Sequence, residues 1–382
     1  DWLTQQSADN QKSLKFKKIN LAFIIMIALL QSFTAFSQDK VVNFYNWADY
    51  IGEDTIENFQ EEYGIKVNYD TYESSEIVEA KLLSGNSGYD LVMHSAMYSK
   101  RLMPIGIFHK VDKSKLKNVG LINTKLMEML SVFDPGNEMM IPYSYGSTGI
   151  TYNEDMILER LPDAPVGSGA MLFDPEVVSK FADCGISVLD SPTDVIPTAL
   201  AYLGYRDDSL DPKELREVED LLLEVRPYIK KFTSSTLLND LPNGDLCMAQ
   251  SWAGDYATAK MRSEEAGKTI NLKYFVPSEG SLLWLDIMVI PNDAPNLENA
   301  YLLMDYLMRP EISADFVNLT HYASPIPSAD KFLKDGVRED PAIYPTPEIM
   351  NRLTLTPVDP PKYNRMKTRI FTRFKTNQKR KQ

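Results

Sequence analysis

The most unusual residue of this sequence is an aspartate inside a long apolar run. Positions 282–290 read Leu-Leu-Trp-Leu-Asp-Ile-Met-Val-Ile, with Asp286 near the centre. Such a run predicts a buried central strand. A buried carboxylate costs several kcal/mol unless it is paired or neutralised, so we expect a cationic group to contact Asp286. A Lys or Arg of the chain could supply that charge, and a strand end at the solvent would remove the need for it.

Three of the four tryptophans stand two or three residues before an aspartate. The pairs are Trp47 with Asp49, Trp252 with Asp255, and Trp284 with Asp286. Aromatic faces beside a carboxylate suit an organic ammonium ion, each cation–π contact contributing ~0.5–2 kcal/mol. The pattern therefore predicts a site for a small organic cation.

The alternative is that each Trp belongs to the core and each Asp caps a helix. This alternative has particular weight at two positions. Asp255 follows Gly254 at a predicted strand-to-helix turn, and Asp194 stands three residues after Ser191, the spacing of a capping box.

Signatures of common enzyme classes are absent from the sequence: it has no GxSxG, no P-loop, no HExxH and no GxGxxG after a strand. The only histidines, His94, His109 and His321, are too few and too scattered for a triad or a metal site. We therefore expect no metal and no cofactor. Paired acids and tryptophan platforms would also suit a carbohydrate-active enzyme, which is the rival class.

The net charge of −13 is unevenly distributed. The first 37 residues carry +2, the end from Lys362 carries +9, and the stretch from Gln38 to Pro361 carries −24. So acidic a body is a poor partner for nucleic acid, and it attracts small cations. Much of this acid also serves as ordinary solvated surface.

The composition is that of a soluble globular protein, and 382 residues suffice for two domains. Cys184 and Cys247 are 63 residues apart and belong to no CxxC motif. They form either one disulfide in an oxidising compartment or two buried thiols.

The N-terminal region has the pattern of a secretory signal peptide. A positive stretch, Lys12 to Lys18, precedes the apolar run Ile19 to Leu30 and then Ala35-Phe36-Ser37. We expect export and cleavage after Ser37. The alternatives are an uncleaved anchor, for which the apolar run is short, and a lipoprotein, for which no cysteine lies near the cut.

Two α/β units must position these residues. Strands are expected at 41–45, 65–69 and 89–93, with helices at 53–63 and 75–83 between them. This alternation predicts a parallel sheet with its ligand beyond the carboxyl ends of the strands, where the loops 46–50 and 94–97 lie. A second unit follows, with strands at 185–189 and 246–250, helices at 191–203 and 212–229, and a later helix at 296–308.

Four motifs together resemble the periplasmic polyamine-binding proteins of ABC transporters, most closely the putrescine-binding type. They are Phe44-Tyr45-Asn46-Trp47, Ser251-Trp252-Ala253-Gly254-Asp255, Trp284-Leu285-Asp286 and His321-Tyr322-Ala323. The resemblance spans nearly all of the chain after the signal peptide. It implies an α/β fold of the type II periplasmic-binding-protein class, in which each of two lobes is a central sheet flanked by helices and the ligand lies in the cleft between them.

The resemblance also implies how the chain is divided. Lobe 1 would comprise 38–143 and 282–322, and lobe 2 would comprise 144–281 and 323–378, with the signal peptide at 1–37 and a basic tail at 379–382. The strand that contains Asp286 would be one of the crossovers between the lobes. Proteins of this kind are usually monomers.

The same resemblance implies eleven ligand-binding positions and one disulfide. The cleft walls would be Trp47, Tyr50, Trp252, Trp284 and Tyr322; the acids that neutralise the amines would be Asp49, Asp194, Asp255 and Asp286; Ser95 and Ser234 would give polar support. Cys184 and Cys247 would match the cysteine pair of the putrescine-binding type.

The implied function is capture of putrescine, or of spermidine, for delivery to a membrane permease, without any bond made or broken. A sensor that presents the closed form to a receptor is the alternative among binding proteins. Two departures concern specificity: Ala48 replaces a frequent Ser or Thr, and Trp284 replaces the usual Phe of the putrescine type, as in the spermidine type. His94 is also unusual, because its charging near pH 6.5 would disfavour a cation.

Overall fold

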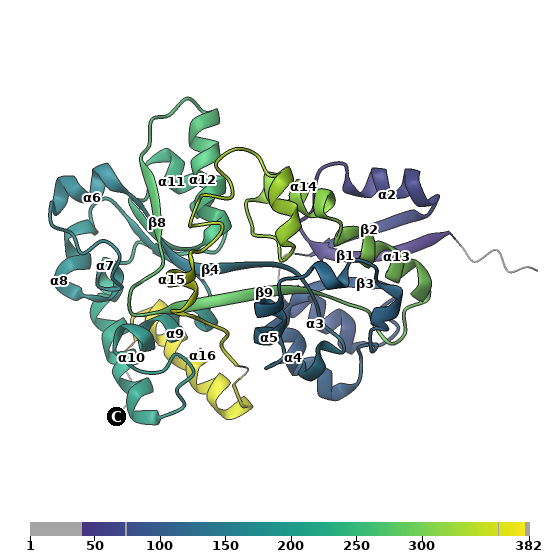
Figure 1. Cartoon of the computed structure of the whole chain (residues 1–382). Coiled ribbons are helices and arrows are strands. Elements are labelled where there is room, and N and C mark those ends of the chain that lie inside the picture. The colour runs from purple at the N-terminus through teal and green to yellow at the C-terminus, as the bar shows by residue number, and fades with distance from the viewer. Residues whose placement is uncertain (1–39, 73–74, 358, 379–382) are drawn as a thin grey trace, which may run out of the picture. The chain divides into compact units, whose positions relative to one another are not determined.

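Figure 1 presents a computed structural model of the protein, which describes residues 40–72, 75–357 and 359–378. The predicted signal peptide and the predicted basic tail lie outside the described residues. The chain divides after Val41, and Val42–Gln382 forms one compact unit. Apart from the first residue of β1, this unit holds every element discussed below.

The core of the unit is a ten-stranded sheet. Eight strands form the path β2-β1-β3-β9-β4-β7-β5-β6, while β8 pairs with β4 and β10 pairs with β9. The strands are β1 (Val41–Trp47), β2 (Lys66–Tyr72), β3 (Leu91–Ser95), β4 (Ile141–Asn153), β5 (Ile186–Val188), β6 (Lys231–Phe232), β7 (Met248–Trp252), β8 (Leu272–Phe275), β9 (Ser281–Val289) and β10 (Leu353–Thr354).

The direction of the strands changes along this path. β1 runs parallel to β3, and β5 runs parallel to both β6 and β7, as the alternating pattern of the sequence predicts. β9 lies between β3 and β4 and is antiparallel to both. The expectation that 282–290 forms a buried central strand is confirmed, whereas its antiparallel direction makes the sheet a mixed one.

β4 and β9 run side by side through the middle of the sheet (Figure 1). The first half of β4 pairs with β9 from Ile141 to Ser147, and its second half pairs with β7 from Thr148 to Tyr152. The two parallel groups of strands are therefore connected through β4 and β9. The lobe boundaries given above stay a prediction.

Helices flank the sheet (Figure 1). They are α2 (Thr55–Tyr63), α3 (Ser75–Leu83), α4 (Ala96–Leu102), α5 (Thr124–Leu130), α6 (Glu154–Arg160), α7 (Ala170–Phe173), α8 (Pro175–Val178), α9 (Pro192–Tyr202), α10 (Pro212–Val225), α11 (Leu237–Asn243), α12 (Ala253–Glu265), α13 (Leu297–Leu307), α14 (Pro310–Thr320), α15 (Pro347–Met350) and α16 (Pro361–Thr376). None of the helices in the described part is long and apolar enough to cross a bilayer.

All five helices predicted from the sequence are present. α2 ends at Gly64, which adopts the left-handed conformation (φ 62°) expected of a glycine stop. α10 is shorter than the predicted 212–229, because the chain tightens into a 3₁₀ turn at Arg226–Tyr228, where Pro227 lacks the amide hydrogen that an α-helix needs.

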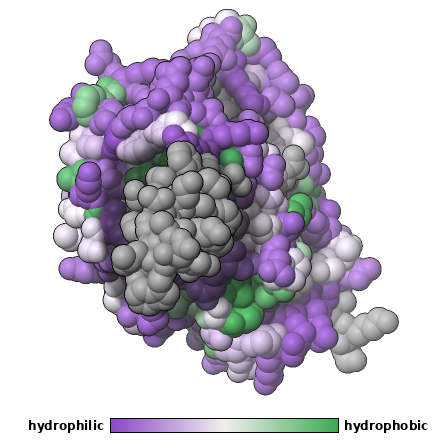
Figure 2. Space-filling view, turned by 90° about the vertical axis from the view of Figure 1, so that its right-hand side faces the viewer, coloured by the Kyte–Doolittle hydropathy of each residue, from purple (hydrophilic) through white to green (hydrophobic). Residues whose placement is uncertain are grey.

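One buried cluster joins α9, α10 and the C-terminal helix α16 to strands β5 and β7. Ile370, Phe371 and Phe374 insert the apolar face of α16 into this cluster. Cys184 and Cys247 form a disulfide there, next to the starts of the neighbouring strands β5 and β7. The disulfide expectation is therefore confirmed. On the face shown in Figure 2, hydrophilic side chains predominate over hydrophobic ones.

Candidate ligand-binding site

A cavity of about 1050 Å³ opens where several strands end. Its lining includes the predicted loops after β1 and β3, residues of β9, the end of β7, and the first turns of α9 and α12. All eleven residues predicted for the site line it: Trp47, Asp49, Tyr50, Ser95, Asp194, Ser234, Trp252, Asp255, Trp284, Asp286 and Tyr322. Residues distant in sequence are thus brought together, as a ligand at the ends of the strands requires.

Asp286 occupies the middle of β9, opposite Ser95 of β3 and Ser144 of β4. The Tyr50 hydroxyl donates a hydrogen bond to its Oδ2 at 2.8 Å. Burial raises the pKa of Asp286 to about 7, although the Tyr50 hydrogen bond opposes the rise. No Lys or Arg in the described part of the chain forms an ion pair with it, so the internal pair considered above is not found there.

Asp194 lies in the first turn of α9 and accepts three side-chain hydrogen bonds. Its Oδ1 accepts from Thr148 Oγ1 at 2.6 Å and from Trp252 Nε1 at 3.2 Å, and its Oδ2 accepts from Ser191 Oγ at 2.6 Å. Burial raises the pKa of Asp194, and these three donors oppose the rise. The Ser191 side chain makes no capping bond, so this carboxylate orients the Trp252 indole instead of completing a capping box.

Asp255 serves the helix and the cavity together. Its Oδ2 accepts a long hydrogen bond of 3.4 Å from the backbone N–H of Trp252 at the start of α12, so the helix-cap alternative holds in part. Its Oδ1 accepts a hydrogen bond of 3.1 Å from the Tyr322 hydroxyl. Burial raises the pKa of Asp255 to about 7, with the Tyr322 and Trp252 hydrogen bonds opposing the rise.

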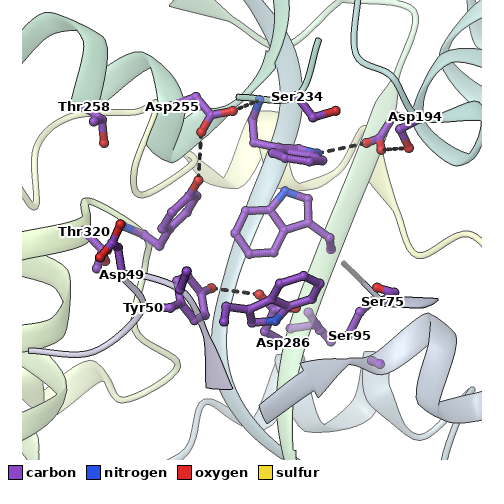
Figure 3. Close-up of a pocket in the computed structure, with 18 of the residues that line it drawn as sticks. Asp49, Tyr50, Ser75, Ser95, Asp194, Ser234, Asp255, Thr258, Asp286 and Thr320 are labelled. Atoms are coloured by element: carbon purple, nitrogen blue, oxygen red, sulfur yellow. Dashed lines mark hydrogen bonds between the residues drawn. The ribbon is translucent and has the colours of Figure 1, made fainter. Parts of the chain in front are cut away.

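The fourth acid differs from the others. Asp49 is exposed and follows β1 in the left-handed conformation (φ 55°), which Asp tolerates better than most residues. In Figure 3, Asp194 and Asp255 lie at one side of the view and Asp286 at the opposite side, with the cavity between them. These three acids are therefore spread across the cavity and could contact charges at both ends of one elongated ligand.

Aromatic rings line the space between these acids. Tyr322 stands edge-on to Trp284, with ring centroids 5.3 Å apart, and edge-on to Tyr50, with ring centroids 5.5 Å apart. Trp47 packs on Tyr72 at 4.4 Å. Each ring is held by another ring or by a carboxylate, so the walls of the cavity are preformed.

The two predicted serines have different surroundings. Ser95 is the last residue of β3 and faces Asp286 across the strand pair. Ser234 Oγ accepts a hydrogen bond from the backbone N–H of Asp190 at 3.2 Å, which fixes the loop before α11.

Further hydroxyl groups at the cavity escaped the sequence analysis. Ser75, Thr258 and Thr320 line it and are labelled in Figure 3. Ser75 is the first residue of α3 and comes shortly after the end of β2. A hydroxyl residue so soon after a predicted strand could have been recognised from the sequence as a candidate for the cavity. The two threonines lie within the helices α12 and α14, where nothing in the sequence separates a cavity-lining threonine from an ordinary one.

The expectation for His94 is wrong. His94 is fully buried on β3 and is absent from the cavity lining. Burial, with a smaller effect of the Arg101 charge, lowers the pKa of His94 to about 3. The imidazole therefore stays neutral near pH 6.5 and places no positive charge beside a bound cation. In the described residues, no group of three or more His, Cys, Asp or Glu side chains is arranged to hold a metal ion.

The fold and the site together define a protein that binds a small solute in a cavity at the ends of its strands. The chain belongs to the bacterial extracellular solute-binding protein family, whose model matches residues 54–346. Its fold is that of the type II periplasmic binding proteins, a mixed α/β sheet with flanking helices.

The particular relatives agree with the resemblance stated for the sequence. The putrescine-binding periplasmic protein of Pseudomonas aeruginosa is 44% identical over 89% of this chain and 93% of its own length. The putrescine-binding periplasmic protein of Escherichia coli is 39% identical over 90% and 93%. A crystal structure of the spermidine/putrescine ABC transporter substrate-binding protein of Streptococcus pneumoniae matches with a TM-score of 0.77 at 28% identity, over 88% of this chain and 99% of that one.

Proposed function

We propose that this protein captures a polyamine outside the cytoplasm and delivers it to the permease of an ABC transporter. The observation that carries the proposal is a set of three acids, the buried Asp194 and Asp255 and the half-buried Asp286, which lie across one aromatic-walled cavity without a cationic partner in the described residues. Three acceptors spread across such a cavity match a ligand with separated ammonium groups.

The physical chemistry of a diamine explains why this combination is needed. A dication loses strong hydration when it enters a protein, and only charge-assisted hydrogen bonds at its ends offset that loss. Between its ends the ligand is a methylene chain, which aromatic faces contact without leaving a polar group unpaired. Trp252 and Trp284 would cover the chain, and Asp49 at the solvent would attract the arriving cation.

Putrescine is the first expected ligand and spermidine the second. Support for this order comes from the relatives named above as putrescine-binding, and from 32% identity to the spermidine/putrescine-binding periplasmic protein of Escherichia coli. Trp284, which resembles the spermidine type, is the residue that argues for the larger ligand.

Delivery rests on closure of the cleft. Contacts from both sides stabilise a closed form, the permease recognises that form, and no bond of the ligand is made or broken. The proposal includes export by the predicted signal peptide, cleavage after Ser37, a periplasmic location and action as a monomer. The family assignment and the periplasmic relatives support the location.

Calorimetric titration tests the proposal. The protein is expressed as the full chain, collected from the periplasm, unfolded and refolded to remove bound ligand, and titrated with putrescine and then with spermidine. We expect tight one-to-one binding of at least one of them. A folded sample that gives no heat with either polyamine would overturn the proposal. The carbohydrate-active enzyme would then be the hypothesis to test next.

Delivery needs a separate test, because a sensor would bind the same ligand. Deletion of the gene should abolish uptake of radiolabelled putrescine by intact cells if the protein feeds a permease. Unchanged uptake with a changed transcriptional response to putrescine would favour the receptor-coupled sensor instead.

A further inference from the structure

The Trp284 side chain on β9 occupies space that a side chain at position 146 of the neighbouring strand β4 would fill. It faces Gly146 directly across the antiparallel pair β4–β9. A Cβ atom added to Gly146 would stand 2.1 Å from Cζ2, 2.6 Å from Cη2 and 2.8 Å from Cε2 of the indole. Carbon atoms do not approach so closely, so the six-membered ring of Trp284 occupies the space that only glycine leaves free.

Among the described residues, only packing contacts hold this indole in place. Within the described residues, Trp284 Nε1 is buried and has no hydrogen-bond partner. Trp252 differs, because Asp194 accepts a hydrogen bond from its Nε1 at 3.2 Å. The position of the Trp284 ring therefore depends on the shape of its surroundings, which are Gly146 beneath it and the edge-on ring of Tyr322 beside it.

We propose that Gly146 is a positioning residue for Trp284 and, through it, a determinant of ligand specificity. The inference rests on the proposed function of the cavity and adds a residue that is absent from the cavity lining. Gly146 and Trp284 act as one unit, in which the glycine decides how far the indole reaches into the cavity.

The direction of the effect follows from the geometry of the strand pair. Residues directly opposite on antiparallel strands project to the same face, so a Cβ on Gly146 would point to the face that bears the indole. Ordinary contact begins at 3.4 Å and the closest approach would be 2.1 Å, so the ring would have to move by about 1.3 Å. The backbone of β4 blocks one direction, and the ring therefore moves off the sheet into the cavity.

A displaced indole takes space from the ligand. It also presses on Tyr322, whose hydroxyl donates to Asp255 at 3.1 Å. Spermidine needs more of the length of the cavity than putrescine, so it suffers more from the loss. A Phe at 284 lacks the outer atoms that meet the added Cβ, and hence tolerates Ala at 146.

A double-mutant cycle tests the inference. The parent, Gly146→Ala, Trp284→Phe and the double variant are titrated with putrescine and with spermidine. We expect Gly146→Ala to weaken binding of the preferred polyamine at least tenfold in the parent, to lower the spermidine-to-putrescine affinity ratio at least threefold, and to change affinity less than threefold in the Trp284→Phe background. Gly120→Ala is the matched control, because a Cβ there meets no atom within 4 Å.

Equal effects of Gly146→Ala in both backgrounds, or binding within twofold of the parent, would overturn the inference. Thermal unfolding of the same four proteins is followed by circular dichroism. If Gly146→Ala alone does not fold but the double variant with Trp284→Phe does, the coupling is supported. If neither Gly146→Ala nor the double variant folds, the coupling is contradicted. If the parent binds no polyamine, the proposed function fails, while the melting cycle still reports whether Gly146 positions Trp284.

Discussion

Asp286 has one hydrogen-bond donor, Tyr50, and no ionic partner in the described part of the chain, so its charge remains available for a ligand. We predict that Asp286→Asn weakens putrescine binding by well over tenfold. The reason is that removing one partner of a buried charge pair costs roughly 3–5 kcal/mol. Calorimetric titration of the refolded variant measures the change.

Asp183→Asn is the control for this variant. Asp183 is an exposed acid that pairs with Arg160 away from the cavity, and its replacement should leave affinity unchanged. If Asp286→Asn binds putrescine as tightly as the parent, the ligand does not use the acid of β9 and the placement of the site is wrong.

The pH dependence of binding follows from the same acids. Burial raises the pKa of both Asp255 and Asp286 to about 7, whereas amines of the ligand keep their protons well above that pH. Below pH 7 these carboxylates are protonated in the free protein and must lose their protons to pair with the cation. We predict that affinity for putrescine falls at least tenfold between about pH 8 and about pH 6, as titrations at both pH values would measure.

Variants separate this effect from general acid sensitivity. Asp255→Asn and Asp286→Asn should each give a shallower pH profile than the parent, because one titrating group is gone. His94 should contribute nothing to the profile in this range, since burial keeps the imidazole neutral. A parent whose affinity is flat across this range would show that the two carboxylates are already ionised in the free protein.

Residue types were enough to single out acids and rings that the fold brings to one cavity, because an Asp in an apolar strand and a Trp beside an Asp are locally conspicuous. The partners of those residues could not be predicted. The Thr148 hydroxyl that binds Asp194 comes from β4, 46 positions away, and only the folded sheet brings it there. The burial of His94 was missed for a similar reason, because a histidine before Ser95 looks the same whether its strand faces the cavity or the core.

At the scale of the elements, alternation of strands and helices predicted the parallel parts of the sheet correctly. β9 was recognisable as a central strand because both of its faces are covered and its residues are almost all apolar. β4 was not recognised, although it is almost entirely buried, because Gly146, Gly149 and several hydroxyl residues dilute its apolar pattern. Without β4, the antiparallel centre of the sheet could not be inferred.

The disulfide joins the chain segments that lead into the neighbouring strands β5 and β7. The cross-link closes a loop with a sequence separation of 63 residues, which limits the unfolded chain and corresponds to about 4 kcal/mol by loop-closure entropy. We predict that Cys184→Ser/Cys247→Ser lowers the melting temperature markedly while the refolded protein still binds putrescine, because neither cysteine lines the cavity. Calorimetric melting and titration of this variant check both parts.

The parent treated with a thiol reductant is the companion experiment. It should melt at the same temperature as the double serine variant. An unchanged melting temperature in both cases would mean that the two thiols are not linked in the exported protein.

At the scale of the whole molecule, ligand binding and folding are linked because the cavity draws residues from distant parts of the chain. A ligand at one hundred times its dissociation constant stabilises the folded state by about 2.7 kcal/mol, provided that it does not bind the unfolded chain. We predict that putrescine raises the melting temperature by an amount that grows with the logarithm of its concentration.

The melting temperature is also measured with cadaverine and with shorter diamines. These ligands differ from putrescine only in chain length. Arginine, which also carries a carboxylate, should give no shift because the buried acids would repel that group. A shift with arginine equal to that with putrescine would contradict selection by separated ammonium groups.

The location of the tryptophans gives the protein a built-in optical reporter. Trp47, Trp252 and Trp284 all line the cavity, and the fourth, Trp2, precedes the predicted cleavage position. If the chain is cleaved after Ser37 as proposed, the indole emission of the whole protein would originate within a single cavity. Occupation of that cavity can therefore be followed through the fluorescence spectrum of the unlabelled protein, at concentrations far below those that calorimetry requires.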